Sequence, residues 1–500
     1  PGTEQRANGL VGQVVRMLDR RGLLERITGS TRPPAPAPAF MFAAMRLDLT
    51  VLADNPLYAL PVPQARLTQV LAERAAELGV ELRRGHELTD LAQDDEAVTA
   101  TVAGPDGTYR LRTRYLAGAD GGHSMTRKRS GIGFPGVTRD NTVSRTVNAA
   151  PPAEWVDPGT GALNVPGYGR PIPPFMHHRT DTGLFVYAPF PGRPMMVVTV
   201  EYGVPDDTTT PLTLAEMEES IRRVLGADVP LTPPPAENRP GNGTADATGG
   251  GQHLMRRLVG TNTRLADRFR DRRVLLVGDA AHVHSATGGP GLNLGLQDAV
   301  NLGWKLAAAV RDDARASLLD TYEAERRPVG QRVIMQTQAQ SALNAPGPDV
   351  TALRELFGEL LTYPRNVRHI AETMAGSDVR YEADGHPLAG RFAPDMDLRT
   401  ANGPARLAQL TRDARPLLLD MTETGLPSDG PWQRVRAETQ SAEATALLLR
   451  PDTYVAWASS AARPDAAEIG ALRTAAGHWF GEAPGAGARA AGDAPAPARR

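Results

Sequence analysis

Residues 273–282 read Arg-Val-Leu-Leu-Val-Gly-Asp-Ala-Ala-His, and residues 288–293 read Gly-Gly-Pro-Gly-Leu-Asn. The consecutive apolar residues predict a strand of a parallel sheet that is covered on both faces. Asp279 stands at the carboxyl end of this strand, where open α/β sheets bind ligands, and its carboxylate can accept hydrogen bonds from sugar-like hydroxyls. The glycines allow a close backbone approach, and a helix beginning at about Gly291 would direct unpaired N–H groups at an electron-rich ligand. The two segments therefore predict a ligand site after a buried strand.

Length, charge and composition narrow the class of protein. The 500 residues are enough for about two to four domains with sizeable cores. A formal net charge of −2 gives no global basic field, so neither nucleic acid nor an anionic membrane is a favoured partner. The absence of cysteine excludes disulfides, zinc–thiolate sites and thiol catalysis, and agrees with a cytoplasmic location. No run of about 18 apolar residues is present, which argues against a transmembrane segment. A homodimer is compatible with these features.

The pattern of apolar residues and turn residues predicts the order of the elements. Helices are expected within residues 1–29, ending at Arg21-Gly22 or at Gly29, over 64–78 and over most of 291–375. Strands are expected at 80–83, 98–102, 109–114, 184–187, 195–202, 416–420, 446–449 and 454–458. Thr213 with Glu216 three residues later forms a capping box, and Gly226 closes the helix that this box begins.

A second strand-to-carboxylate junction is present at residues 115–122, which read Tyr-Leu-Ala-Gly-Ala-Asp-Gly-Gly and continue as His-Ser-Met-Thr-Arg. This segment resembles the Asp-Gly motif of class A flavoprotein monooxygenases of the para-hydroxybenzoate hydroxylase type, and residues 278–293 resemble their Gly-Asp motif. The likeness extends over most of the chain, including residues 61–64, residues 322–326 and the C-terminal αβ unit. That unit, which has no Cys-x-x-Cys, resembles the branch of the family that hydroxylates aromatic polyketides, rifamycins and phenols.

The resemblance implies an α/β fold: a Rossmann-like FAD-binding domain with an inserted β-rich substrate domain and a C-terminal thioredoxin-like domain. The expected segments are 1–140 and 266–385 for the FAD-binding domain and its helices, 141–265 for the substrate domain, 386–484 for the thioredoxin-like domain and 485–500 for a disordered tail. The low-complexity stretch 233–251 is expected to be a mobile loop of the substrate domain. The family's first βαβ unit, with its G-x-G-x-x-G loop, should lie before Arg6 and is absent, so we expect that the sequence begins after it.

The resemblance also assigns residues to cofactor binding. Asp279 would hold the flavin ribityl chain or the pyrophosphate. The start of the following helix would present backbone N–H groups to the pyrimidine end of the isoalloxazine, where reduced flavin carries extra negative charge. The positions carried over are Gly278, Gly289, Pro290, Gly291, Leu292 and Asn293 at this turn, Asp120, Gly121 and Arg127 at the FAD and nicotinamide contacts, Gln64 near the ribityl chain, Leu88 near the adenine, and Arg6 before the helix near the flavin. A surface ion pair is the alternative role for Arg127. No catalytic residue and no metal ligand is assigned.

The activity that the resemblance implies is hydroxylation of a large aromatic compound, polyketide-like or phenolic. NADPH or NADH would reduce FAD, O2 would form the flavin C4a-hydroperoxide, and oxygen would pass to an electron-rich ring. The protein would supply orientation, electrostatics and exclusion of water. A Baeyer–Villiger or epoxidising oxygenase on the same scaffold is the nearest alternative, and a remnant that has lost its cofactor is an alternative from a different class.

Several other patterns have simpler interpretations. His282 and His284 have H-x-H spacing, but no third ligand is near in the sequence, so a metal site is disfavoured. The charge run from Glu323 to Arg327 is interpreted as a solvated helix face with intrahelical pairs. Trp304 and Trp457 are interpreted as core residues. No G-x-S-x-G elbow is present, which argues against an α/β-hydrolase.

Overall fold

The structure, a computed structural model, describes residues 9–190, 194–203, 210–234, 255–285, 288–311, 316–381, 385–439 and 443–481. The chain forms two compact units, each made of several segments. Unit 1 comprises Pro1–Gly12, Ala35–Gly295 and Gly330–Ala375, and unit 2 comprises Gln13–Pro34, Leu296–Val329 and Gly376–Arg500. Arg6, residues 235–251 of the low-complexity stretch and the tail 485–500 lie outside the described residues.

The predicted strand before Asp279 is β15 (Val274–Leu276), in unit 1. It pairs in parallel with β8 (Leu116–Gly118) and antiparallel with β14 (Arg270–Asp271). All three β15 side chains are buried, as the unbroken apolar run predicts. Because β8 and β15 run in the same direction, the residues that follow them reach the same edge of the sheet. The two strand-to-carboxylate junctions are therefore neighbours in space.

The prediction of one helix within residues 1–29 is wrong. The described part forms strand β1 (Gly9–Val11), helix α1 (Gln13–Asp19) and helix α2 (Leu24–Thr28). Gly12 and Gly22 interrupt the helical pattern with φ angles of 79° and 66°. A Cβ at Gly12 would lie 2.4 Å from the carbonyl oxygen of Ala375, so this position requires glycine.

The helix expected over residues 64–78 is confirmed as α3 (Gln64–Glu77), and Gly79 follows with a φ of 74°. Residues 80–83 form no strand, which contradicts the prediction; Val80 and Leu82 are instead half exposed. The next sheet has the order β5-β6-β7, and β6 and β7 confirm the expected strands. Its strands are β5 (Glu87–Gln93), β6 (Val98–Gly104) and β7 (Gly107–Thr113). Two short antiparallel sheets complete this region: β1 pairs with β4 (Ala59–Pro61), and β2 (Ala39–Phe42) forms a hairpin with β3 (Met45–Asp48).

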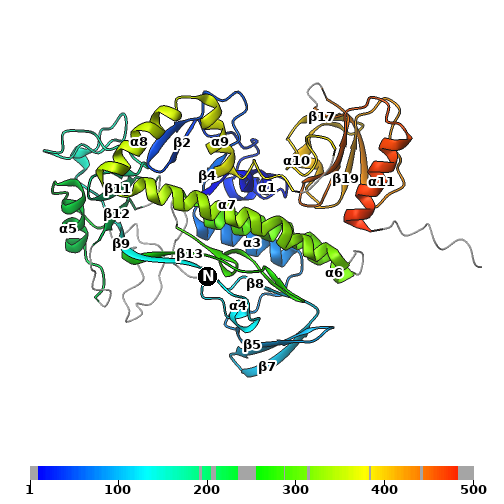
Figure 1. Ribbon diagram of the computed structural model, residues 1–500, viewed down its shortest axis with the longest axis horizontal. Helices are drawn as coiled ribbons and strands as arrows, with labels where there is room; N and C mark the ends of the chain where they lie inside the picture. The colour runs from blue at the N-terminus through cyan, green and yellow to red at the C-terminus, as the bar shows by residue number, and fades with distance from the viewer. Residues whose placement is uncertain are drawn as a thin grey trace, which may run out of the picture. The chain divides into compact units, whose positions relative to one another are not determined.

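A six-stranded antiparallel sheet in the order β10-β11-β12-β9-β13-β16 follows in unit 1. Its strands are β9 (Gly136–Asn148), β10 (His178–Arg179), β11 (Gly183–Ala188), β12 (Met196–Tyr202), β13 (Met255–Leu265) and β16 (His282–Val283). Helix α5 (Leu214–Leu225) lies beside β11 and β12 (Figure 1). Met217 and Ile221 of α5 share one apolar core with Val147 and Phe185 of the sheet.

The cap of α5 confirms half of the predicted capping box. The Thr213 hydroxyl accepts a hydrogen bond from the Glu216 N–H, and Gly226 ends the helix in the left-handed conformation. The Glu216 carboxylate does not close the box but binds the guanidinium groups of Arg145 and Arg257. Local spacing therefore gave the helix start correctly, while ion pairs with two strands decided the direction of the acid.

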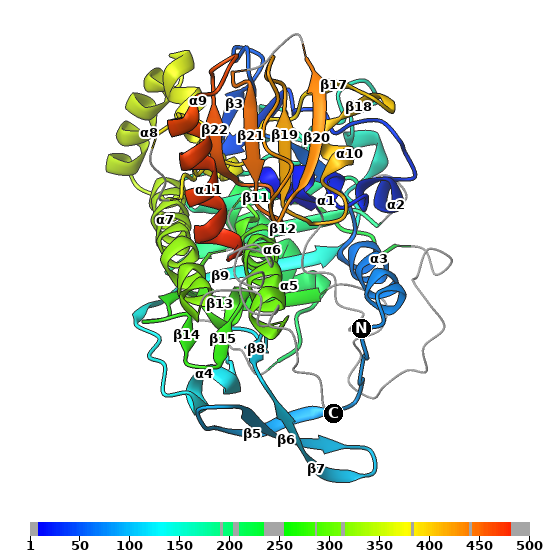
Figure 2. The same ribbon diagram turned by 90° about the vertical axis from the view of Figure 1, so that its right-hand side faces the viewer.

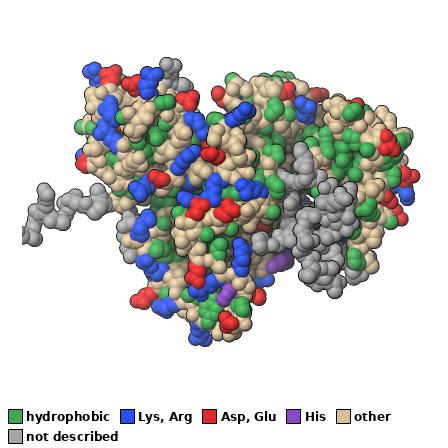
Figure 3. Space-filling view, turned by 180° about the vertical axis from the view of Figure 1, so that it is seen from behind, with side chains coloured by type: hydrophobic (Ala, Val, Ile, Leu, Met, Phe, Trp, Pro, Cys, Tyr) green, Lys and Arg blue, Asp and Glu red, His purple; other side chains and the backbone are tan. Residues whose placement is uncertain are grey.

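The region 291–375 is mainly helical, as predicted. Its helices are α6 (Pro290–Arg311), α7 (Asp320–Asn344), α8 (Pro348–Leu360) and α9 (Pro364–Ala375). Within the described ranges, no helix combines the length and apolar content needed to cross a membrane. On the face drawn in Figure 3, acidic and basic side chains are interspersed, in keeping with the near-neutral formal charge.

Unit 2 contains a second six-stranded sheet, in the order β18-β17-β20-β19-β21-β22. Its strands are β17 (Asp397–Thr400), β18 (Gly403–Arg406), β19 (Leu417–Asp420), β20 (Gln433–Glu438), β21 (Ala446–Leu449) and β22 (Val455–Ser459), and its helices are α10 (Leu407–Leu410) and α11 (Ala466–Phe480). β19, β21 and β22 confirm the three strands predicted here, and α11 runs alongside β22 (Figure 2). Trp457 packs in the core beneath α11, as expected.

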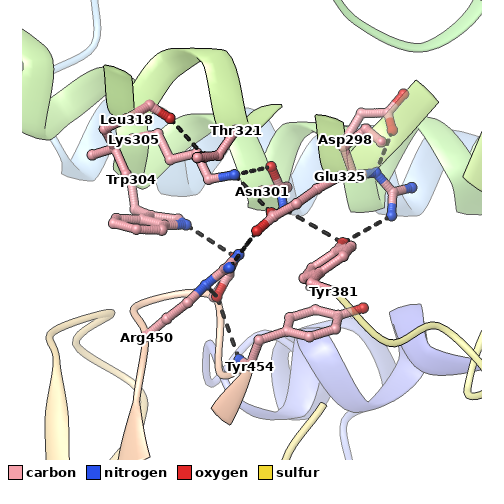
Figure 4. Close-up of polar contacts among 12 residues, drawn as sticks. Asp298, Asn301, Trp304, Lys305, Leu318, Thr321, Glu325, Tyr381, Arg450 and Tyr454 are labelled. Atoms are coloured by element: carbon pink, nitrogen blue, oxygen red, sulfur yellow. Dashed lines mark hydrogen bonds and ion pairs between the residues drawn. The ribbon is translucent and has the colours of Figure 1, made fainter. Parts of the chain in front are cut away.

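The interpretation of residues 323–327 as a solvated helix face is wrong, because Glu325 is buried within unit 2. Its carboxylate accepts a hydrogen bond from Lys305 Nζ at 2.7 Å and two from the Arg450 guanidinium at 2.5 and 2.9 Å (Figure 4). Burial acts to raise the pKa of Glu325, but the charges of Arg450 and Lys305 outweigh it and lower the pKa to about 2. Glu325 is therefore an ionised residue between two buried cations.

The neighbouring contacts extend this buried ionic network. Arg326, also fully buried, donates from Nε to Asp298 at 2.7 Å. The Trp304 indole N–H donates to Asp452 at 3.0 Å, and the Arg450 guanidinium lies over the Trp304 ring. Trp304 is only partly buried, so it serves as a partner of this network more than as an ordinary core residue.

Candidate functional site

Two carboxylates stand at one edge of the β14-β15-β8 sheet. Asp120 follows β8, and Asp279 follows β15 within the short 3-10 helix Gly278–Ala280. The Asp279 side chain is exposed and accepts no hydrogen bond from any described residue. Gly278 has a φ of 61° and closely approaches Gly295 of α6: a Cβ at Gly278 would lie 3.6 Å from the Gly295 Cα. The strand end thus packs directly on α6 while the carboxylate stays available to a ligand.

Asp120 organises the loop after β8. Its carboxylate accepts a hydrogen bond from the Ser124 hydroxyl at 2.6 Å and one from the Thr126 N–H at 2.9 Å. Burial acts to raise the pKa of Asp120, but these hydrogen bonds outweigh it and lower the pKa. A Cβ at Gly121 would meet no described heavy atom within 4 Å. Asp120 is therefore an ionised residue that holds an open glycine turn.

Arg127 links the two motifs. Its side chain is buried and donates from Nη1 to the Ala280 carbonyl at 2.8 Å and from Nη2 to the Gly122 carbonyl at 2.9 Å. The guanidinium also stacks on Phe134, 3.7 Å from the ring centroid. Its partners are thus backbone carbonyls of the two motif loops, not a surface carboxylate.

The start of α6 reaches the same edge. Asn293 fixes it by donating from Nδ2 to the Gly289 carbonyl at 2.8 Å and accepting the Val11 N–H at Oδ1 at 2.9 Å. A Cβ at Gly291 would lie 4.0 Å from an Asp279 carboxylate oxygen. The first turn of a helix leaves backbone N–H groups unpaired. The backbone N–H groups at the start of α6 and the carboxylate of Asp279 therefore lie together at this edge of the sheet, where one ligand could contact both.

The other predicted positions lie around this centre or on separate elements. Pro290 and Leu292 belong to the first turn of α6 and are partly buried. Gln64 is the first residue of α3, and Leu88 lies in β5, opposite Val102. Hydrogen bonds thus join the two motif segments, whereas Gln64 and Leu88 stand on other elements of unit 1.

His284 places an imidazole beside the helix start. Its Cε1 lies 3.6 Å from where a Cβ at Gly291 would be, and its Nδ1 contacts the Ser285 carbonyl oxygen at 2.9 Å. Burial lowers the pKa of His284, so the ring is uncharged at neutral pH. The His282 and His284 rings stack 6.4 Å apart. No group of three or more residues of the types His, Cys, Asp and Glu could hold a metal ion in the described part of the chain.

Some residues of this edge were not part of the sequence prediction. Ser124 caps helix α4 (Met125–Arg129) by accepting the Arg127 N–H, and its position before a helix start is a signal that could have identified it. The bond between Val11 and Asn293 joins residues 282 positions apart, so no local pattern could reveal it.

The chemistry of these groups fits FAD. An exposed acceptor at Asp279 suits ribityl hydroxyls, and the unpaired N–H groups of α6 suit the electron-rich pyrimidine edge of a flavin. Open glycine surfaces at Gly121 and Gly289, where an added Cβ would meet no described heavy atom within 4 Å, allow a flat ligand to approach the backbone.

Comparisons with known proteins show the family of the chain. Residues 2–337 match the family model described as FAD binding domain, and residues 386–483 match the model described as aromatic-ring hydroxylase, C-terminal. The chain is 37% identical over 495 residues to 12-dehydrotetracycline 5-monooxygenase/anhydrotetracycline 6-monooxygenase of Streptomyces rimosus, covering 95% of this chain and 91% of that protein. It is 36% identical to rifampicin monooxygenase of Streptomyces venezuelae, covering 97% and 92%.

A solved structure agrees over the same length. The anhydrotetracycline hydroxylase OxyS from Streptomyces rimosus superposes with a TM-score of 0.79 at 34% identity, covering 97% of this chain and 92% of that one. The resemblance noted from the two motifs is therefore confirmed across the FAD-binding and C-terminal regions. The chain belongs to the FAD-dependent aromatic-ring monooxygenases.

Proposed function

We propose that the edge after β8 and β15 binds FAD through Asp279 and the start of α6. Asp279 would accept hydrogen bonds from the ribityl chain or a group linked to the pyrophosphate. The first turn of α6 would face the pyrimidine end of the isoalloxazine, where its positive end favours negative charge. The observation that carries this proposal is the exposed Asp279 carboxylate, which has no hydrogen-bond partner in the described chain and lies beside the helix start.

Neighbouring residues would hold the two loops around the cofactor. Arg127 fixes the spacing of the loops because it donates to one carbonyl in each. Asp120 keeps the turn at Gly121 in shape for the FAD and nicotinamide contacts. The family resemblance further assigns Gln64 to the ribityl chain, Leu88 to the adenine side and Arg6 to the approach of the helix near the flavin.

Bound FAD would supply the redox chemistry, accepting a hydride from NADPH or NADH and activating O2 so that one oxygen atom reaches the substrate ring. The residues of this chain bind and orient the cofactor and keep water from the reacting atoms. Glycine at positions 278, 289 and 291 lets the backbone approach the ring system closely. Burial lowers the pKa of the His284 imidazole beside the helix start, so this ring adds no positive charge there at neutral pH.

The substrate class that we propose is a large polycyclic aromatic compound, polyketide-like or phenolic. The similar proteins are named for acting on tetracycline intermediates and on rifampicin. The substrate would lie between the flavin and the six-stranded sheet of unit 1. Hydroxylation is favoured over Baeyer–Villiger or epoxidising oxygenation because the C-terminal region matches the aromatic-ring hydroxylase model.

The test uses the full chain loaded with FAD. Added anhydrotetracycline should stimulate the oxidation of NADPH or NADH and the consumption of O2, and the product should carry one new hydroxyl group whose oxygen comes from labelled O2. Asp279→Ala should lose FAD, whereas the exposed Asp106→Ala in the β6–β7 turn should retain it. If Asp279→Ala retained as much FAD as Asp106→Ala does, the cofactor site would be contradicted. A product that is an ester or an epoxide would replace hydroxylation with the alternative chemistry.

A further inference from the structure

Two buried amides on α7 carry atoms that have no hydrogen-bond partner. Gln340 and Asn344 are 1% and 2% exposed, and Gln340 Nε2, Asn344 Nδ2 and Asn344 Oδ1 are all unpaired within the described chain. The two residues are four positions apart on one helix, so they lie on the same face, one turn from each other. Buried polar groups are nearly always paired in folded proteins, so three unpaired atoms on one helix face require an explanation.

The contacts of Gln340 connect this helix face with the proposed flavin turn. The Ala43 N–H donates to Gln340 Oε1 at 3.2 Å, which fixes the orientation of the amide and leaves Nε2 as its unpaired donor. A Cβ at Gly288 would lie 3.3 Å from this Nε2 and 3.7 Å from Met374 Cε. Gly288 opens the Gly-Gly-Pro-Gly turn before α6. The unpaired donor of α7 therefore lies against the segment proposed to approach the flavin.

A strained hairpin tip meets the same amide. Strands β2 and β3 are joined by only Ala43 and Ala44, whose φ angles of 49° and 60° are in the left-handed region that Gly, Asn or Asp usually occupies in such turns. Ala43 is held in place by Gln340 at its N–H and by Arg354, which donates to its carbonyl at 2.5 Å. Backbone strain persists only where its surroundings enforce it, commonly at ligand sites.

Apolar side chains and two guanidinium groups lie near the amides: Arg354 and Arg179 donate to the carbonyls of Leu343 and Ala345, on either side of Asn344. Phe42, Leu343 and Ala371 belong to one buried cluster, against which Met374 packs. Ligand sites are mostly apolar with a few polar groups that fix orientation. A primary amide offers an acceptor and donors without charge. The complementary ligand edge is therefore uncharged and carries an acceptor next to a donor, as a ring carbonyl beside a phenolic hydroxyl does.

We propose that Gln340 and Asn344 form the polar recognition site for the oxygenated edge of the aromatic substrate. Asn344 would donate from Nδ2 to the ring carbonyl and accept the neighbouring hydroxyl at Oδ1, while Gln340 Nε2 donates a further hydrogen bond. These residues bind and orient and take no part in bond making, so they decide which part of the ring system meets the flavin. The inference rests on the proposed function, because it identifies the part of the proposed aromatic substrate that would hydrogen-bond to the protein.

The experiment measures binding to the FAD-loaded full chain without NADPH. The probes are 1,8-dihydroxyanthraquinone, which has the carbonyl and hydroxyl edge, and anthracene, which lacks both; the flavin absorbance change gives each affinity. Asn344→Leu preserves volume and removes the hydrogen-bonding atoms, so it should weaken the first probe at least about tenfold and leave the second unchanged. Gln331→Leu makes the same kind of change at an exposed position of α7 and should alter neither affinity.

Thermal melting without ligand separates recognition from a structural role. Because the polar atoms of Asn344 are unpaired in the described chain, Asn344→Leu and Asn344→Ala should keep a near wild-type melting temperature. A large fall of that temperature in both variants would overturn the inference, since the amide would then have a partner within the protein. Unchanged affinity for the dihydroxy probe, equal loss of both probes, or a wild-type chain that binds neither would also overturn it.

The binding assay needs no turnover, so the two proposals can fail separately. If Asn344→Leu weakens binding of the dihydroxy probe but the wild-type chain oxidises no aromatic compound, only the proposed hydroxylation is contradicted. A chain that hydroxylates its substrate while Asn344→Leu binds the dihydroxy probe as tightly as wild type would contradict the recognition site alone.

Discussion

Replacing Gly291 with alanine should change the affinity for FAD without lowering the stability of the FAD-free protein. An added Cβ would lie 3.6 and 3.9 Å from two atoms of His284 and 4.0 Å from an Asp279 oxygen, all ordinary van der Waals distances. Gly291 lies in α6 and has no positive φ, so its backbone accepts alanine without strain. Alanine is favoured over glycine within a helix by about 0.5–1 kcal/mol, and by less near a helix end. The FAD-free variant should therefore be as stable as wild type or slightly more stable.

The same methyl group would occupy the space proposed for the flavin. It would project toward Asp279 and His284, between the helix start and the carboxylate that is expected to hold the ribityl chain. Moving the isoalloxazine away from the backbone N–H groups of α6 would cost at least one charge-assisted contact, about 1.5–3 kcal/mol. The dissociation constant for FAD should accordingly rise by about tenfold to a hundredfold.

The assay is a titration of FAD-free protein followed by flavin fluorescence, paired with a chemical unfolding curve of the same preparation. Gly303→Ala is the matched control, because it lies in α6, is exposed, and its Cβ would meet no described atom within 4 Å. It should gain helix stability and leave FAD affinity unchanged. If Gly291→Ala binds FAD as tightly as Gly303→Ala does, the helix start does not contact the flavin. If FAD-free Gly291→Ala is less stable than FAD-free wild type, the added methyl group clashes with His284.

Four further outcomes follow from the contacts described. Asp279→Ala should weaken FAD binding by about 1.5–3 kcal/mol in the same titration, and wild-type affinity would remove Asp279 from the site. Arg127→Met should reduce FAD retained after desalting, because two loop carbonyls lose their shared donor; full retention would show that the loops hold their spacing without it. Glu325→Gln should lower the free energy of unfolding in urea by about 3–5 kcal/mol, since two buried cations lose their counter-charge, whereas the exposed Glu355→Gln should change it by less than about 0.5 kcal/mol. The pKa of Glu325 is lowered to about 2, so its contribution is present above about pH 4.5 and is lost as pH falls toward 2; the stability gap between wild type and Glu325→Gln should shrink over that interval, and a constant gap would refute the assignment.

The parts of the fold that the sequence predicted are those set by local patterns. The apolar run before Asp279 predicted a covered strand, and the carboxylates after two such runs share an edge because the strands are parallel neighbours. The start of α5 followed from Thr213, since a cap depends on a residue and the next turn of backbone. These predictions needed no knowledge of distant residues.

The predictions that failed depended on partners far along the chain. Val80 and Leu82 have an alternating pattern but pair with no strand among the described residues, and both side chains are half exposed. In the sequence, Gly12 is not distinguished from its helix-forming neighbours. In the structure, a Cβ at Gly12 would lie 2.4 Å from the carbonyl oxygen of Ala375. Glu325 has the local pattern of a surface helix and becomes a buried acid because of Arg450, which is 125 positions away. Local periodicity carries no information about such partners.

The buried charges give α6 a second role that its glycine-rich start does not reveal. Asp298, Asn301 and Lys305 are spaced three and four residues apart, so they share one face of the helix, and each is bound to Glu325 or Arg326 of α7. Hydrophobic side chains tolerate small rotations of a helix about its axis, but buried ion pairs do not, because a misplaced charge would lose its partner in a medium of low dielectric constant. The pairs therefore set the rotation of α6. Within unit 2, the acids and bases that look like surface charges in the sequence therefore fix α6 against α7.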